Sequence, residues 1–488
     1  MSKKILSFIL LFSLILSNAP CVLADAQWHE EQGHLYQAGS LSAPNHDEIS
    51  LFSANRNAAM NALSTAMLSL QPSVDISSYR ITPSEIENLF SDTVNAHPEF
   101  FYIGNSYRYY INDSYVSSVQ FTYLYAKEII LQKQALIAEE QQKILSALQP
   151  AMTPLEKALA VHDYFVLHYA YDYERYLNDT LPPSSFAIDG LFIDKTGVCQ
   201  AYALGYMLIM QSLDIPCIFV PSYEMGHAWN MLQLGDSWYH IDVTYDDPVE
   251  TELGFVSHQN FLCSDTGIMN TAHSAWESPY TATDTTYDSA FWKNLRGGLF
   301  YDTGYWYYLS GSMRSIEKRT IDGKPTTVLT DHFDFDTKIT FYNDCIFYNK
   351  AHKVYSLKKD GTQRTIYSTL DENNGSIVGL VLQEQNLVLQ QEDLSSFVQV
   401  PLAPSFSVTI HDDVLTILPT GYWPSSARLY LAFYGRNSEL LLLESLMPQP
   451  SHVQNISVPT YGSPLFVRIM GLDGLTPFVD AKTVHIGG

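Results

Sequence analysis

Apolar residues recur at helical spacing in several separate segments of the chain. They predict one helix over residues 54–70 and a long one over 127–148. Two more helices are expected to begin at capping boxes that have proline at the first helical position, one at Thr82 and one at Thr153. His97-Pro98 should end the first of these two, and the second should continue to about Tyr169.

Aromatic and β-branched residues dominate three other regions and predict strands there. Residues 100–125 indicate two or three antiparallel strands, with turn signals at Gly104-Asn105 and Asn112-Asp113. Beyond residue 290, short strands rich in Tyr and Phe include two Asp-Gly turns 38 residues apart, which indicates a partial β-repeat with too few units to close a propeller. Residues 406–486 suggest about seven short strands of an immunoglobulin- or fibronectin-like sandwich.

One cysteine precedes an apolar segment of helical periodicity. Residues 200–211 form this segment, so Cys199 should lie in the first turn of the helix. The unpaired N–H groups and the positive dipole end at that position lower the pKa of a thiol and make it nucleophilic. Taken alone, Cys199 would more often be a buried structural cysteine.

The segment that follows predicts three strands, over residues 218–221, 227–234 and 238–245. Gly235-Asp236 fits a two-residue type II′ hairpin turn. This register would put His227 and Asp242 diagonally on one face of the sheet at about 7–8 Å, whereas a three-residue loop would send them to opposite faces. Cysteine, histidine and aspartate so placed would act as nucleophile, base and orienting carboxylate.

Three motifs in this order resemble the bacterial transglutaminase-like superfamily. They are Gly197-Val198-Cys199-Gln200-Ala201-Tyr202-Ala203, Gly226-His227-Ala228-Trp229-Asn230, and Trp238-Tyr239-His240-Ile241-Asp242-Val243-Thr244-Tyr245-Asp246-Asp247-Pro248. The resemblance extends over about 153–277, through His162-Asp163-Tyr164, Tyr171-Asp172, and Phe261-Leu262-Cys263-Ser264-Asp265 followed by His273.

The resemblance implies an α+β, papain-like transglutaminase core followed by all-β domains. In it Cys199 would be the nucleophile, His227 the general base and then acid, and Asp242 the residue that orients the imidazole. The chain departs from the family pattern at Ala201 and Tyr245, and we expect neither to touch the triad. Tyr171 is the candidate side chain for the oxyanion hole, and a packed core tyrosine is an equal alternative.

Cofactors and metals are not expected. A zinc site of Cys199, His227, His240 and Asp242 is the alternative reading, but the resemblance accounts for the cysteine, histidine and aspartate without a metal. Asp246-Asp247 could bind calcium, although adjacent acidic residues before a proline more often cap a turn.

The N-terminus has signal-peptide anatomy, and no later apolar run is long enough to span a bilayer. Removing residues 1–26 takes away Lys3, Lys4 and Asp25 and changes the formal net charge from −25 to −26, which disfavours nucleic acid as a partner. Four cysteines remain, too few for a disulfide framework. The expected domains are 1–26 signal peptide, 27–149 α+β, 150–285 catalytic, 286–402 β-repeat and 403–488 sandwich.

These features together predict a secreted enzyme, free or associated with the cell surface. It would form a Cys199 thioester with an amide carbonyl of a protein or peptide, cell-wall peptide among the candidates, and pass the acyl group to water or an amine. The alternative is a catalytically silent surface protein that uses its β domains for binding or as a scaffold.

Overall fold

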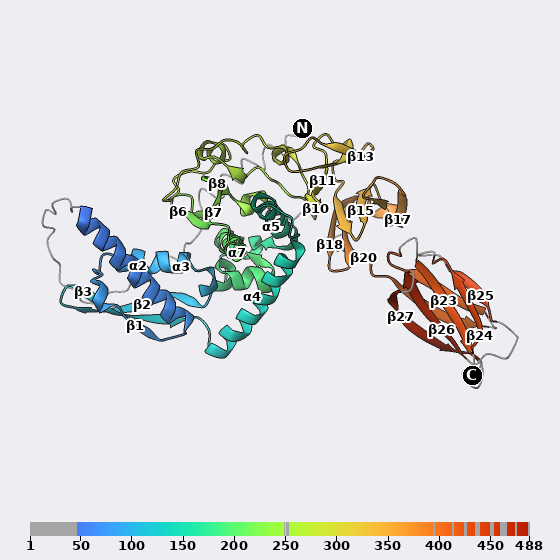
Figure 1. The fold of residues 1–488 in the computed structure, drawn as a ribbon, viewed down its shortest axis with the longest axis horizontal. Coiled ribbons are helices and arrows are strands. Elements are labelled where there is room, and N and C mark those ends of the chain that lie inside the picture. Colours follow the sequence, from blue (N-terminus) through green and yellow to red (C-terminus); the bar gives the residue numbers. More distant parts are fainter. Residues whose placement is uncertain are drawn as a thin grey trace. The chain divides into compact units, whose positions relative to one another are not determined.

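The computed structural model describes residues 46–247, 249, 253–393, 396–411, 414–423, 427–434, 440–448, 453–458, 466–473 and 476–486. The expected signal peptide lies outside these residues. The chain divides into two compact units: the first holds the described residues up to 247 with 255–311, and the second holds most of the residues from 327 onward. Each unit is described separately (Figure 1).

The first unit opens with helices around a small antiparallel sheet of order β1-β3-β2. The elements are α2 (His46–Leu68), β1 (Ser73–Asp75), α3 (Ile86–Asn95), β2 (Ile103–Asn112), β3 (Tyr115–Tyr123) and α4 (Lys127–Ala147). Asp113, at a φ of 56°, makes the β2–β3 turn as predicted, whereas Gly104-Asn105 lies inside β2. The Thr82 backbone N–H does bond the Glu85 carboxylate, but α3 begins only at Ile86.

The central part of the first unit joins α5 and α7 to a four-stranded antiparallel sheet of order β6-β7-β8-β9. Its elements are α5 (Pro154–His168), β4 (Ala170–Tyr171), α6 (Tyr173–Leu177), β5 (Thr196–Gly197), α7 (Cys199–Ser212), β6 (Cys217–Ser222), β7 (His227–Leu234), β8 (Ser237–Ile241), α8 (Val243–Asp246), β9 (Phe261–Cys263) and α9 (Asp265–Met269). The capping box at Thr153 is confirmed, because Thr153 and Glu156 each bond the other's backbone N–H.

The predicted β7–β8 hairpin is confirmed up to Ile241. Leu234 pairs with Ser237 across the turn, and Gly235 has the positive φ of 61° that the first central position of a type II′ turn requires. The strand predicted to reach residue 245 ends at Ile241, because Asp242 caps the short helix α8 instead. Asp242 therefore reaches its position from a helix N-cap and not from the strand ladder.

One hydrophobic cluster runs through the first unit, from Ala59 on α2 to Tyr308. It includes α7, whose Ala201, Tyr202, Tyr206 and Met210 are all buried. A helix that is apolar on nearly every side must be enclosed by other elements, and α7 accordingly contacts β6, β7 and α5. This enclosure holds the helix start that carries Cys199.

Short antiparallel sheets follow. The strands are β10 (Phe300–Asp302), β11 (Tyr305–Leu309), β12 (Ser315–Arg319), β13 (Thr326–Thr330), β14 (Ile339–Tyr342), β15 (Cys345–Lys350), β16 (Lys353–Lys358), β17 (Thr365–Thr369), β18 (Ile377–Gln383), β19 (Asn386–Gln391) and β20 (Val398–Pro401). Within the described residues they form sheets of four, four and three strands, each in sequence order. The two Asp-Gly turns occupy equivalent places, after β12 and after β16.

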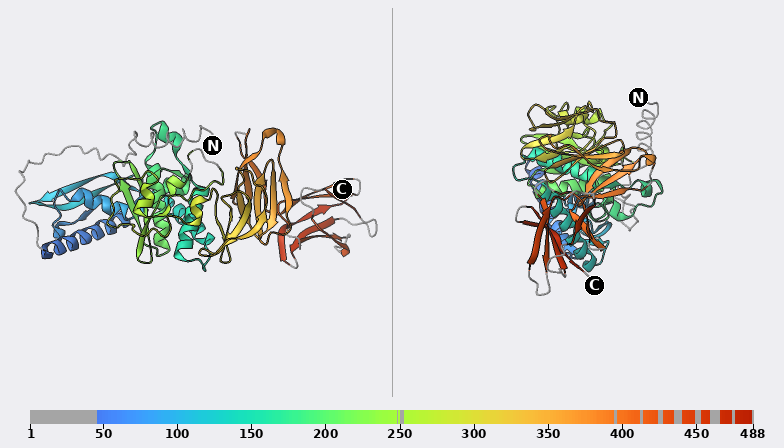
Figure 2. Two further views of the ribbon diagram at one scale, coloured as in Figure 1. Left: turned by 90° about the horizontal axis from the view of Figure 1, so that it is seen from above. Right: turned by 90° about the vertical axis from the view of Figure 1, so that its right-hand side faces the viewer.

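The C-terminal strands, orange to red in Figure 2, form two antiparallel sheets of order β21-β22-β25 and β24-β23-β26-β27. They are β21 (Ser405–His411), β22 (Val414–Thr420), β23 (Ala427–Tyr434), β24 (Leu440–Leu446), β25 (Gln454–Ser457), β26 (Phe466–Asp473) and β27 (Thr476–His485). Both sheets contribute to one core that includes Phe406, Leu415, Leu429 and Val467. The fold class is thus α+β followed by all-β.

No helix in the described part of the chain has the length and apolar content needed to cross a bilayer.

Candidate active site

Three different elements bring the predicted triad together. Cys199 is the first residue of α7, His227 is the first residue of β7, and Asp242 follows β8 as the N-cap of α8. His227 Nε2 lies 2.6 Å from Asp242 Oδ2, and hydrogen bonding and charge from Cys199 act on the same imidazole. Since Nε2 faces Asp242, Nδ1 is the ring nitrogen left for the thiol.

The site is buried, and burial sets its electrostatics. Cys199, His227 and Asp242 are 2%, 3% and 1% exposed. Burial lowers the pKa of His227, but the Asp242 carboxylate and Cys199 outweigh it and raise that pKa to about 10. Burial likewise raises the pKa of Asp242, but the two histidines that bond it bring it well below the usual range. An ionised Asp242 beside a protonated His227 favours the thiolate form of Cys199.

Aromatic side chains enclose the imidazole. The Trp229 ring stacks on His227 with centroids 5.6 Å apart, and the Tyr245 ring lies 4.8 Å from His227. The Tyr245 backbone N–H also donates to Asp242 Oδ1 at 3.1 Å. The expectation that Tyr245 does not touch the triad is therefore wrong, because the turn into α8 folds this residue back over the histidine.

His240 does not join the site. Its Nδ1 accepts a hydrogen bond from Trp229 Nε1 at 2.9 Å, and its Nε2 lies 2.9 Å from Asp265 Oδ1. Both ring nitrogens are therefore engaged away from Cys199. The alternative hypothesis of a zinc site required His240 beside Cys199, and it does not fit this arrangement.

Tyr171 lies on β4, which pairs in parallel with β5 so that Tyr171 is opposite Gly197. The strand pair places this tyrosine beside the segment that leads into Cys199, and its side chain is partly exposed. Its ring contacts Tyr176 edge to face, with centroids 6.1 Å apart. The oxyanion role of Tyr171 stays a prediction.

Two residues of the site have roles that the pattern of the sequence did not assign. Asn230 donates from Nδ2 to the carbonyls of Ala203 on α7 and Ile218 on β6, and so ties the cysteine helix to the sheet that carries His227. His273 lies 2.8 Å from Asp242 through its Nε2. The only sequence signal for them was their place within or after the family motifs.

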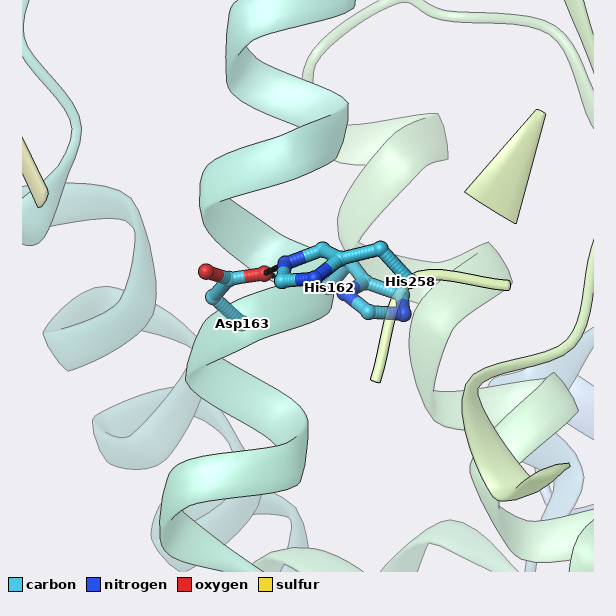
Figure 3. A group of neighbouring side chains, drawn as sticks. All are labelled: His162, Asp163 and His258. Atoms are coloured by element: carbon cyan, nitrogen blue, oxygen red, sulfur yellow. Dashed lines mark hydrogen bonds and ion pairs between the residues drawn. The ribbon is translucent and has the colours of Figure 1, made fainter. Parts of the chain in front are cut away.

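A second buried hydrogen-bond network includes Asp246, the last residue of α8. Asp163 Oδ1 is 3.0 Å from His162 Nδ1 and 2.9 Å from His258 Nε2, and Figure 3 shows the two imidazoles approaching this carboxylate from separate segments. His162 Nε2 lies 3.1 Å from Asp246 Oδ2, at the end of α8. Asn260 donates to Asp246 and accepts from the Asp242 N–H, so the network anchors the helix that Asp242 caps.

Metals bind side chains of the kinds found in both clusters, His227-Asp242-His273 and His162-Asp163-His258. In each cluster the close contacts join imidazole nitrogens to carboxylate oxygens at 2.6 to 3.0 Å, which are hydrogen-bond distances. The polar atoms thus satisfy one another, apart from His258 Nδ1, which has no partner among the described residues. We identify neither cluster as a metal site. Asp246 and Asp247 are also engaged, with His162 and Tyr202, and do not form a calcium site.

The cysteines form no disulfide within the described residues. Cys217 on β6 and Cys263 on β9 are separated by β7 and β8 in the sheet. At about 4.8 Å per strand spacing they are much too far apart to bond. Burial raises the pKa of the Cys217 thiol, which makes it unreactive near neutral pH.

Residues 142–243 match the family model of the transglutaminase-like superfamily. No curated protein matches the chain significantly. Solved structures with likeness to it include a TGase (15% identity, TM-score 0.21, 28% of this chain and 43% of that one), domains 3 and 4 of rat CD4 (17%, 0.14, 28% and 76%), and the extracellular domain of a hybrid two-component system from B. thetaiotaomicron (11%, 0.18, 54% and 43%). TM-scores this low do not establish a shared fold.

The chain spans less than half of the length of the TGase that it resembles. The matched segment nevertheless contains Cys199, His227 and Asp242, the three residues that the structure brings together. The chain therefore contains a transglutaminase-like domain, matched over residues 142–243, and β-rich domains follow it.

Proposed function

We propose that this chain is an exported transglutaminase-like enzyme that acts on amide groups of proteins or peptides. The observation that carries the proposal is the buried His227 imidazole, bonded to Asp242 on one side and to Cys199 on the other. A cysteine at a helix start with such a partner is an activated nucleophile.

In the proposed reaction, His227 takes the proton of the Cys199 thiol and the thiolate attacks the amide carbonyl. The carbonyl oxygen becomes an oxyanion, for which the Cys199 backbone N–H and the Tyr171 hydroxyl are the proposed donors. The tetrahedral intermediate then breaks its C–N bond, His227 returns the proton to the leaving amine, and a thioester remains. Water or a second amine, deprotonated by His227, attacks the thioester and regenerates the thiol.

Hydrolysis and cross-linking share these residues and differ only in the acceptor. Cell-wall peptide is a candidate substrate because the N-terminus reads as a signal peptide, which would place the enzyme outside the cell. The proposal therefore includes both water and an amine as acceptors of the acyl group.

The test is alkylation of the chain from residue 27 onward by iodoacetamide across pH, followed by intact mass. We expect rapid labelling at one site well below pH ~8.5, the ordinary range of a thiol, because the thiolate is stabilised. Labelling should vanish in Cys199→Ala and slow in His227→Gln. Cys217→Ala is the matched control and should label like wild type. Slow labelling that His227→Gln leaves unchanged would refute an activated thiol and favour a binding or scaffold role.

A further inference from the structure

The Asp242 carboxylate is shared between two histidines. Its Oδ2 lies 2.6 Å from His227 Nε2 and 2.8 Å from His273 Nε2, while its Oδ1 accepts the Tyr245 N–H. His273 follows α9 in the chain, outside the segment that matches the family model, and is 2% exposed. The proposed mechanism assigns this histidine no role.

Hydrogen bonds around His273 favour one arrangement of its protons. The Thr271 hydroxyl donates its single proton to the Ile268 carbonyl at 2.7 Å, so its oxygen can only accept from His273 Nδ1, 3.1 Å away. On the other side, an ionised Asp242 can only accept, so His273 Nε2 must donate as well. With both nitrogens donating, the hydrogen-bond geometry fits the imidazolium form of His273.

A positive charge on His273 changes the net charge of the buried site. Without it, a Cys199 thiolate, a His227 imidazolium and an Asp242 carboxylate would leave one uncompensated negative charge, which is costly to bury. With His273 positive the four groups sum to zero. The sum stays zero when the proton moves between Cys199 and His227, so neither state is penalised by a net buried charge.

The surroundings of His273 contain no second carboxylate that contacts it in the described residues. The titratable groups that face it are Asp242, His227, Tyr245 and, more distantly, His240. The Trp229 ring also meets His273 edge to face, with ring centroids 4.9 Å apart. Asp242 is therefore its counter-ion.

We propose that His273 is a positioning residue of the active site: it orients Asp242 toward His227, keeps it ionised, and cancels its charge. This inference rests on the proposed function, because it assigns a role within the same cysteine chemistry. A histidine that merely fills space would contribute shape and no charge, and this difference can be measured.

The experiment is the pH profile of Cys199 alkylation by iodoacetamide in the chain from residue 27 onward. The variant His273→Phe keeps an aromatic ring but has no hydrogen-bond donor. We expect it to move the acid limb of the alkylation profile upward by about one pH unit, so that labelling at a fixed low pH becomes about tenfold slower. His273→Gln keeps one donor to Asp242 and should shift the limb less. Thr271→Val, which removes the acceptor of Nδ1, should shift it slightly in the same direction.

His168→Gln is the matched control, because His168 is a half-buried histidine on α5 that bonds the Tyr164 carbonyl and lies outside the site. It should keep the wild-type profile. A folded His273→Phe protein with the wild-type profile would overturn the proposal. If that variant fails to fold, unchanged profiles in both His273→Gln and Thr271→Val would overturn it equally.

The same data separate this inference from the proposed function. A wild-type chain whose Cys199 labels no faster than an ordinary thiol contradicts the proposed function itself. A wild-type chain that labels rapidly, with His273 variants that do the same, contradicts only the role of His273.

Discussion

At the scale of single residues, the approach of the chain to Cys199 depends on a close contact between two small side chains. A Cβ added at Gly197 would lie 2.7 Å from the Cβ of Ala201, in the first turn of α7, and 3.3 Å from the Ser185 carbonyl oxygen. Ala201 is one of the two positions at which the chain departs from the family pattern. The alanine is accommodated because its neighbour is glycine.

Gly197→Ala should therefore displace the start of α7. We expect an unfolding free energy lower by about 1–3 kcal/mol, as for other overpacked sites, together with slower Cys199 alkylation. Ala201→Gly alone should cost only about 1 kcal/mol through helix propensity. The double variant should be more stable than the sum of the two single effects implies, and additive losses in urea unfolding would show that the contact is unimportant.

At the scale of elements, α5 and α8 are joined by buried charges. Burial lowers the pKa of His162, but Asp163 and Asp246 outweigh it and raise that pKa to about 9. Asp163 itself has a pKa lowered to about 2, because its two histidine partners outweigh its burial. His162 is therefore protonated at neutral pH and connects the two helices, and through Asn260 it supports the turn at Asp242.

Stability should depend on pH accordingly. A histidine whose pKa rises from 6.5 to about 9 on folding stabilises the native state fully below pH 6.5, and this contribution is lost as the pH rises through 9. We expect the unfolding free energy of the first unit to fall by about 1–3 kcal/mol over that window. His227 contributes in the same direction, so the unfolding free energy should be measured by urea unfolding across pH in wild type and in His162→Gln, and the two pH dependences compared. If the unfolding free energy falls equally steeply with pH in both proteins, His162 is not charged.

At the scale of the whole molecule, the hydrophobic clusters are separate. The cluster that encloses α7 contains residues between Ala59 and Tyr308, whereas the sandwich core contains residues between Phe406 and Ile486. Domains with their own cores tend to unfold independently. One contact that joins the sandwich to the preceding sheets is the Tyr422 hydroxyl, near Cys345 and Asp344.

A chain that ends at residue 402 should therefore keep the reactive thiol. We expect calorimetry of the longer chain to show more than one transition, and the truncated chain to lack one of them. Cys199 alkylation should be unchanged, because none of the described sandwich residues belongs to the core around α7. A large fall in labelling rate after truncation would instead show that the β domains support the site.

Local signals in the sequence predicted much of the first unit, and together with the family motifs they led to the choice of Cys199, His227 and Asp242. Periodicity and capping predicted α4, α5 and α7 to within a few residues, and the Gly235-Asp236 turn predicted the β7–β8 register. These features depend on neighbours in the chain, which a sequence pattern records directly.

Contacts between distant segments were decided only by the tertiary structure. Strand parity predicted that His227 and Asp242 share a face, but β8 ends at Ile241, and the aspartate reaches the histidine because it caps α8. The contact of His273 with the same carboxylate, 31 residues further along, was not predicted, because the only sequence signal for this histidine was its place after a family motif. Periodicity determines which side of its own element a residue occupies. Packing of separate elements around a common core determines which buried charges meet.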